Sequence, residues 1–158
     1  MRLHVVLVEP EIPQNTGNVA RTCAAVGADL HLVHPLGFRV DDAAVRRAGL
    51  DYWNLLTIHE YDSLTSFLGR HADSHLYLFS ARGSVAHTAI TYAAESYLIF
   101  GKETEGLPEE LIRGGTGEVV RIPIREDARC LNLSNAVAVG VFEVLRQWGY
   151  PGQAAMKL

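Results

Sequence analysis

Three polar segments of this sequence carry residue types that could hold a ligand and transfer a group. Residues 9–21 read Glu-Pro-Glu-Ile-Pro-Gln-Asn-Thr-Gly-Asn-Val-Ala-Arg, residues 101–108 read Gly-Lys-Glu-Thr-Glu-Gly-Leu-Pro, and residues 121–135 end in Asn-Leu-Ser-Asn. The second segment offers backbone N–H groups with little side-chain bulk, which suits a flat ligand such as an adenine or a ribose. Each segment follows an apolar run, and open α/β sheets bind ligands beyond the carboxyl ends of their strands. We therefore expect the three segments to form one composite site.

Single residues in these segments also have purely structural explanations. An arginine on a helix, such as Arg21, is usually a solvated surface residue, and Ser134 or Asn135 could simply be a helix N-cap. Asn15, Asn18 and Arg21 lie about one helical turn apart, however, so they could project toward one end of a helix. A polar patch at a helix N-terminus favours phosphate.

Several familiar catalytic and binding patterns are missing. No GxGxxG motif follows the first apolar run, which disfavours a dinucleotide site, and Ser134 does not lie in a G-x-S-x-G elbow. His71 and His75 are four residues apart but lack the glutamate of a zinc HExxH motif, and a solvated helix end explains them as well. We expect His31 and His34 at the end of a strand. The sequence therefore predicts no metal.

Strand-like apolar runs alternate with helix-like segments along the chain. Most of the runs are rich in Val, Ile and Leu without polar alternation, as expected for parallel strands buried on both faces. The order predicts an α/β fold, with an open, mostly parallel sheet and helices on both faces. The predicted strands are residues 3–8, 30–34, 55–58, 76–80, 97–100 and 119–122, and the predicted helices are residues 16–26, 41–48, 63–70, 108–113 and 134–148.

Two features of these predicted helices can be tested directly. Pro108 suits the first position of its helix. The helix at 134–148 is apolar on nearly all sides, so we expect it to be buried in the core or against a second copy of the chain.

The composition fits one domain spanning residues 1–158. Two distant cysteines, no signal peptide and no long apolar run predict a cytoplasmic protein without a disulfide framework or a membrane span. The net charge of −4 argues against a surface that coats polyanions generally. Only Lys102 and Lys157 are lysines among the 14 basic residues, and arginine grips phosphate bidentately. Any nucleic acid would therefore bind at a local arginine-lined patch.

Taken together and in this order, the three segments resemble the motifs of the SPOUT superfamily of RNA methyltransferases. Within it they are similar to the small tRNA 2′-O-methyltransferases that modify the wobble nucleotide, as is the stretch at residues 46–52. The resemblance covers nearly the whole chain. It implies a deep C-terminal trefoil knot that forms the S-adenosylmethionine pocket, and a homodimer that binds the tRNA anticodon stem-loop across its interface.

The resemblance also implies roles for individual residues. Arg21 would be catalytic, with Glu103, Ser134 and Asn135 close by, and the RNA would contact Asn15, Asn18 and Arg46. Cysteine stands at position 130, where the family has a small hydroxyl residue, so a backbone contact is expected there. The cofactor would touch Phe79, Gly101, Ile122, Cys130 and Leu131.

The implied reaction is attack of a ribose 2′-oxygen on the sulfonium methyl of S-adenosylmethionine, which needs no metal. A guanidinium stays protonated at neutral pH, so we expect Arg21 to clamp a phosphate and polarise the hydroxyl rather than to act as a base. Glu103 is the alternative base, although it could instead hold Arg21 or a loop amide. Methylation of ribosomal RNA or of another tRNA position, and RNA binding without catalysis, remain alternatives.

Overall fold

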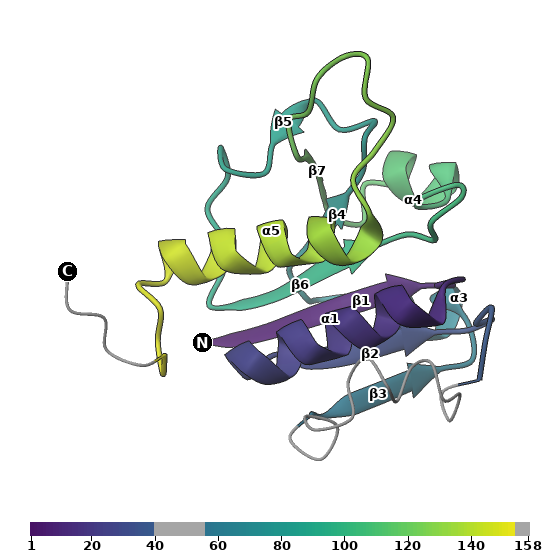
Figure 1. Cartoon of the computed structure of the whole chain (residues 1–158), viewed down its shortest axis with the longest axis horizontal. Helices are drawn as coiled ribbons and strands as arrows, with labels where there is room; N and C mark the ends of the chain where they lie inside the picture. Colours follow the sequence, from purple (N-terminus) through teal and green to yellow (C-terminus); the bar gives the residue numbers. More distant parts are fainter. Residues whose placement is uncertain (40–55, 154–158) are drawn as a thin grey trace.

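The computed structural model describes residues 1–39 and 56–153, and in this part of the chain seven strands form one sheet. The strand order is β3-β2-β1-β6-β4-β7-β5, and every pairing is parallel (Figure 1). The strands are β1 (Arg2–Val8), β2 (Asp29–Val33), β3 (Ile58–Tyr61), β4 (Leu76–Phe79), β5 (Val85–Ala86), β6 (Glu95–Phe100) and β7 (Glu118–Arg121). The predicted α/β architecture is confirmed.

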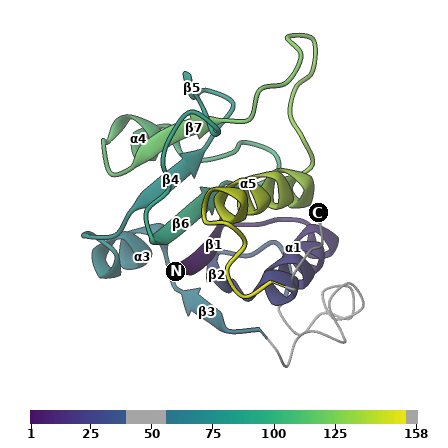
Figure 2. The same ribbon diagram turned by 90° about the vertical axis from the view of Figure 1, so that its left-hand side faces the viewer.

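Helices cover both faces of this sheet. Helices α1 (Pro13–Val26) and α5 (Leu133–Gln147) lie side by side on one face, and α3 (Leu64–Arg70) and α4 (Glu109–Arg113) lie on the other (Figure 2). Side chains alternate along β1, so Leu3, Val5 and Leu7 join the core under α1 and α5, whereas Val6 and Val8 join the core on the α3 side. Burial on both faces explains the uninterrupted apolar runs.

Most predicted boundaries agree with the structure within one or two residues, and the differences have local causes. The strand predicted at 55–58 is found at Ile58–Tyr61, because this edge strand reads Ile-His-Glu-Tyr and lacks a continuous apolar run. Helix α1 begins at Pro13, three residues before the prediction, with the proline in its first turn. Pro108 is the N-cap of α4 rather than its first helical residue. The two-residue β5 is too short to leave a sequence pattern.

Two predictions about the fold are not tested by the described residues. The helix predicted at 41–48 falls outside the described residues, and the trefoil knot stays a prediction. None of the helices in the described part of the chain has both the length and the apolar character that a membrane span requires.

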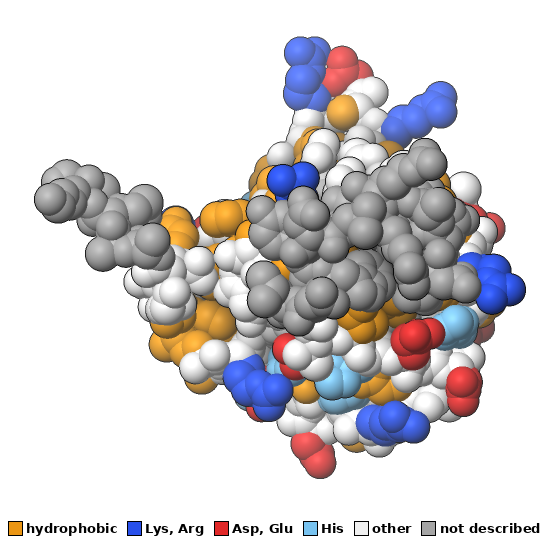
Figure 3. Space-filling view, turned by 60° about the horizontal axis from the view of Figure 1, so that its bottom comes forward, with side chains coloured by type: hydrophobic (Ala, Val, Ile, Leu, Met, Phe, Trp, Pro, Cys, Tyr) orange, Lys and Arg blue, Asp and Glu red, His pale blue; other side chains and the backbone are white. Residues whose placement is uncertain are grey.

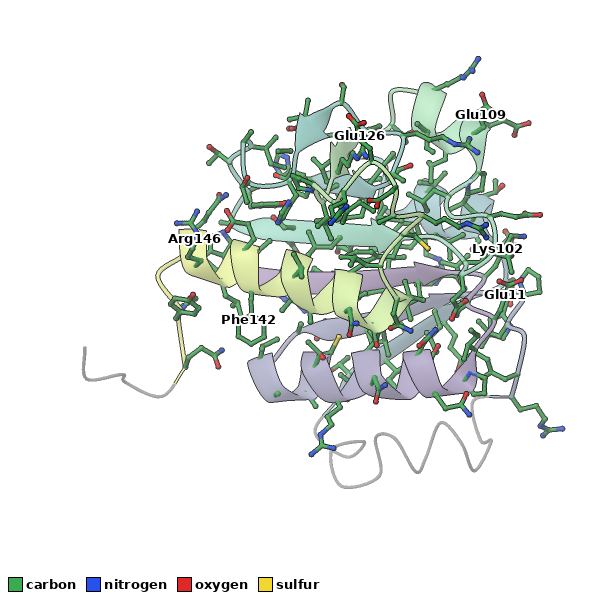
Figure 4. The ribbon with its side chains drawn as sticks, turned by 45° about the horizontal axis from the view of Figure 1, so that its top comes forward. Glu11, Lys102, Glu109, Glu126, Phe142 and Arg146 are labelled. Carbon is green, nitrogen blue, oxygen red and sulfur yellow. The ribbon has the colours of Figure 1, made fainter. Side chains whose placement is uncertain are left out.

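Helix α5 is not buried on all sides in the single chain. Of the two predicted alternatives, burial in the core of one chain therefore does not hold for every side of this helix. Val137, Val141 and Val144 are fully buried, but Val139 is 39% exposed and Phe142 is 51% exposed. Figure 4 shows Phe142 projecting from α5. An apolar stripe of this helix is therefore left without a partner within the described chain.

Candidate active site

A cavity of about 570 Å³ lies where β4, β6 and β7 end and α5 begins. All five predicted cofactor residues line it, although they come from four separate stretches of the chain. The same cavity is lined by residues of all three polar segments, as predicted from their positions after strands. Those five residues are Phe79, Gly101, Ile122, Cys130 and Leu131.

The loop at residues 101–106, here called the glycine loop, is folded back on itself at one wall of this cavity. The Gly106 N–H donates to the Lys102 carbonyl oxygen at 2.9 Å. A Cβ atom on Gly101 would lie 2.0 Å from the Gly106 carbonyl carbon, so only glycine fits position 101. Gly106 has a φ of +72°, which also favours glycine. The loop is therefore closed tightly by its two glycines, and residues 101–106 all line the cavity.

An aromatic pair forms the apolar part of the cavity. The rings of Phe79 and Phe100 stack with their centroids 4.6 Å apart. Helix α5 approaches them closely at Gly140, where a Cβ atom would lie 2.9 Å from Phe79 Cζ. This close packing fixes the pair beside Ile122, which gives the cavity a rigid apolar wall.

Glu103 connects the glycine loop to the start of α1. Its carboxylate accepts hydrogen bonds from the Glu11 N–H at 2.8 Å, from the Ile12 N–H at 3.2 Å and from Asn15 Nδ2 at 2.9 Å. Helix α1 has no side-chain cap of its own. The negative charge of the Glu103 carboxylate instead lies beside the N-terminus of α1, where the helix dipole is positive, and stabilises it. A carboxylate of the same chain therefore lies beside the start of α1, and the binding of a phosphate by the polar patch on this helix stays a prediction.

A second chain of hydrogen bonds links the first segment to the third. Asn132 Nδ2 donates to Asn15 Oδ1 at 2.9 Å, and Asn132 Oδ1 accepts from the N–H and the hydroxyl of Ser134 at 2.9 and 2.7 Å. Asn132 is thus the N-cap of α5, a role that the sequence suggested for Ser134 or Asn135. The three segments meet through side chains that hold one another in place.

The glycine loop and the first segment share a further contact at the rim. Glu11 accepts from both the N–H and the hydroxyl of Thr104, at 3.0 and 2.9 Å. Lys102 Nζ lies 3.4 Å from Glu9 and 3.0 Å from Glu105. Figure 4 shows Glu11 and Lys102 close together at this end of the molecule.

The predicted catalytic and RNA-contacting residues do not all gather at the cavity. Glu103 and Asn15 line it, whereas Arg21, Asn18, Ser134 and Asn135 are not among its lining residues. Asn15 is only 6% exposed while Asn18 and Arg21 are exposed, so Asn15 does not share their surface, and the projection of all three toward one end of α1 stays a prediction. At about 1.5 Å per residue, position 21 lies roughly 12 Å along α1 from its start. Arg46 falls outside the described residues.

Two arginines at the cavity were not singled out from the sequence. Arg82 follows β4 and Arg129 follows β7, and both line the cavity. Arg82 Nη1 lies 3.6 Å from a Glu109 carboxylate oxygen, but its side chain is 56% exposed. Their positions in loops after strands, together with the excess of arginine, were the available signal. They give the cavity rim positive charge of the kind predicted for a local phosphate-binding patch.

Comparison with known proteins identifies the family to which this chain belongs. Residues 2–142 match the model of the SpoU rRNA Methylase family. The chain belongs to this family. A tRNA (cytidine(34)-2′-O)-methyltransferase of Yersinia pestis is 47% identical, with 95% of this chain and 96% of that protein covered. A protein of the same name from Escherichia coli (strain K12) is 45% identical, covering 95% and 96% respectively.

Two solved structures also agree with the fold of this chain. A structure that gives insights into the 2-OH methylation of C/U34 on tRNA has a TM-score of 0.89 at 43% identity, covering 94% of this chain and 97% of that one. The AdoMet-bound rRNA methyltransferase from Sinorhizobium meliloti has a TM-score of 0.82 at 29% identity, covering 92% of this chain and 56% of that one. The resemblance that the three motifs suggested is confirmed.

Proposed function

We propose that this SpoU family protein uses S-adenosylmethionine to methylate the ribose 2′-oxygen of the wobble nucleotide of tRNA, cytidine 34 or a modified uridine 34. The observation that carries this proposal is the convergence of three distant segments on one cavity, joined through Glu103, Asn15 and Asn132. The choice of tRNA position 34 is supported by the relatives at 45–47% identity that bear this activity in their names.

The cavity fits S-adenosylmethionine in size and in chemistry. Its volume of about 570 Å³ lies within the usual range for small-molecule sites, roughly 300–1,000 Å³. The Phe79 and Phe100 pair and Ile122 supply an apolar wall for an adenine, and the backbone around Gly101 and Leu131 supplies donors and acceptors. When bound, the cofactor would supply a methyl group that its sulfonium already activates. The protein then has to align the reacting atoms and stabilise developing charge.

A second copy of the chain would complete the site. Arg21 lies outside the cavity of its own chain, and the exposed Val139 and Phe142 leave an apolar stripe on the neighbouring helix. We infer a homodimer that buries this stripe of α5 together with part of α1. Such a pairing would bring Arg21 of one chain toward the cavity of its partner, because a twofold interface exchanges equivalent surfaces.

In the completed site, Arg21 would bind the phosphate next to the target ribose and polarise the 2′-hydroxyl, whose proton leaves to that phosphate or to water. Glu103 is a poor candidate for the base, because its two carboxylate oxygens already accept three hydrogen bonds from α1 and the residues before it. Its role would be to position Asn15 and the glycine loop. Arg82 and Arg129 would hold further phosphates of the anticodon loop.

The test is methylation of unfractionated tRNA with methyl-labelled S-adenosylmethionine, followed by digestion and mass identification of the labelled nucleoside. We expect label on the ribose at position 34, and none on a transcript that carries a 2′-deoxyribose there. Label elsewhere in tRNA, or label only in ribosomal RNA, would replace the substrate assignment. Cofactor binding without transfer to any RNA would overturn the proposed catalysis.

A further inference from the structure

A compact group of metal-ligand side chains lies on the sheet face that α3 covers, away from the cavity. His4 of β1 and Asp29 and His31 of β2 each offer one donor atom, and these atoms all lie within 4.8 Å of one another. We propose that these three residues bind one zinc ion, or a similar divalent transition metal that prefers imidazole. Sequence spacing gave no sign of this group, because its members come from two strands brought together by their parallel register, in which His4 lies opposite Asp29.

The separations between the donor atoms suit a shared ion. His4 Nδ1 lies 3.0 Å from His31 Nε2 and 3.7 Å from Asp29 Oδ2. Zinc binds nitrogen and carboxylate oxygen at about 2.0–2.2 Å, so tetrahedral ligands lie roughly 3.3–3.5 Å apart. The observed distances bracket this value, and small side-chain shifts would accommodate the ion. A water molecule would complete the coordination.

Each histidine is also oriented through its other ring nitrogen. His4 Nε2 lies 3.2 Å from Glu95 Oε1, and His31 Nδ1 lies 3.0 Å from the Tyr61 hydroxyl. Ligating histidines in metalloproteins are usually held in this way, by a carboxylate or another polar group behind the ring. The arrangement directs His4 Nδ1 and His31 Nε2 toward the same point.

Binding the ion requires a change of tautomer but no net release of protons, because in the metal-free protein one proton lies between His4 Nδ1 and His31 Nε2, which are 3.0 Å apart. The Glu95 carboxylate accepts from His4 Nε2–H, which leaves the lone pair on Nδ1 for the ion. His31 then carries its proton on Nδ1 and donates to the Tyr61 oxygen, while the Tyr61 hydroxyl donates to His71 Nε2 at 3.0 Å.

The types of the three ligands determine which ion fits, and a neighbouring positive charge opposes its binding. Two imidazoles and one carboxylate favour zinc, cobalt or nickel over magnesium and calcium, which prefer oxygen ligands. His59 Nε2 lies 3.4 Å from Asp29 Oδ2 and is partly exposed, but His59 does not belong to the group of donor atoms that lie within 4.8 Å of one another. Arg2 Nη2 also lies 3.4 Å from Asp29 Oδ2 and competes with a cation, although the Arg2 side chain is 69% exposed and can turn away. On the face shown in Figure 3, histidine side chains reach the surface between acidic and basic groups.

The experiment titrates metal-free protein with Co²⁺ and follows visible absorption, and then measures zinc displacement of the cobalt band. We expect one ion per chain, a band typical of four-coordinate cobalt, and no competition from excess Mg²⁺. Asp29→Asn keeps the shape of a partly exposed side chain, and His4→Phe keeps the ring that stacks on Tyr97 with centroids 4.1 Å apart. Each should weaken zinc binding by at least about tenfold.

Two further variants separate this site from chance binding at surface histidines. His75→Ala removes an exposed histidine outside the group and should leave the affinity unchanged. Arg2→Gln removes the competing cation and should tighten zinc binding. The proposal is overturned if the wild-type protein takes up no zinc, or if its affinity survives both Asp29→Asn and His4→Phe. If His4→Phe does not fold by circular dichroism, Asp29→Asn and Arg2→Gln alone decide the outcome.

Discussion

Glu103 and Asn15 lie 88 positions apart in the sequence, and a 2.9 Å hydrogen bond joins the carboxylate of one to the side-chain amide of the other. Asn15 in turn accepts from Asn132, the N-cap of the last helix. The cavity is therefore held together by a polar chain that runs from the glycine loop through the first helix to the last one. A substitution at either end of this series of hydrogen bonds should alter the geometry of the cavity.

Glu103→Gln tests whether this carboxylate positions the loop or takes the proton. Glutamine keeps one acceptor oxygen, so at least one of the three donors now bound to Glu103 loses its partner. We expect the free energy of unfolding to fall by about 1–3 kcal/mol and cofactor affinity to fall with it, while single-turnover methylation at saturating cofactor persists.

The matched control for this change is Glu105→Gln in the same loop. The Glu105 side chain is 73% exposed and pairs only with Lys102 among the contacts described for it, so its replacement should change stability little. Complete loss of the single-turnover step in Glu103→Gln, with normal stability and cofactor binding, would instead identify Glu103 as the base.

Mixing two inactive variants tests whether Arg21 acts in the partner's site. Arg21→Ala should lower turnover on the order of 10²-fold, and Gly101→Ala should abolish cofactor binding because its Cβ would lie 2.0 Å from the Gly106 carbonyl carbon. If the two chains exchange after mild denaturation, a mixed dimer contains one intact site. Statistical mixing should restore about a quarter of wild-type activity.

The control for this experiment is each variant refolded alone, which should stay inactive. Activity of the mixture no higher than that of the separate variants, with mixed dimers shown by mass spectrometry, would mean that Arg21 serves its own chain. An Arg21→Lys protein with full turnover would remove the planar, bidentate role from the mechanism.

Thiol labelling should distinguish the two cysteines and report on the cavity. Cys130 is exposed and lines the cavity, whereas Cys23 is fully buried, and burial raises the pKa of its thiol. Iodoacetamide should modify Cys130 alone in the native protein, as peptide mass mapping would show. Saturating S-adenosylmethionine should slow the reaction severalfold. Undiminished labelling with the cofactor bound would argue that Cys130 lies outside the cofactor site.

Acid stability should depend on Glu143 of α5. A hydrogen bond from Arg146 Nε at 2.8 Å lowers the pKa of this nearly buried carboxyl below its usual value. A lowered pKa in the folded state gives a contribution that is complete above the unfolded pKa of about 4.5 and is lost as the pH falls further. Urea unfolding between pH 7 and pH 3 should therefore show a smaller loss of stability for Glu143→Gln than for the wild-type protein.

The control for the pH experiment is Glu109→Gln, which removes a half-exposed carboxylate that pairs with Arg113 and Arg82. Solvent screens such a pair, so this variant should follow the wild-type pH profile closely. Identical profiles for the wild type and Glu143→Gln would show that the pair of Glu143 with Arg146 contributes nothing to acid stability.

The sequence alone determined the parallel α/β sheet, the order of its elements and the three segments that line the cavity. These follow from local pattern, because buried parallel strands leave continuous apolar runs and ligand loops follow the carboxyl ends of strands. Gly101 and Ile122 each stand at the end of such a run, and both line the cavity.

Only the tertiary structure decided which side chains point where. Asn15 turns inward while Arg21 turns outward, because their directions depend on the rotation of α1 against the sheet, and the carboxylate that serves the start of that helix comes from a distant loop. The group formed by His4, Asp29 and His31 depends on the register of β1 against β2, where a slip of one residue would move each side chain to the opposite face. Such contacts arise from packing between distant segments, and packing leaves no periodic trace in the sequence.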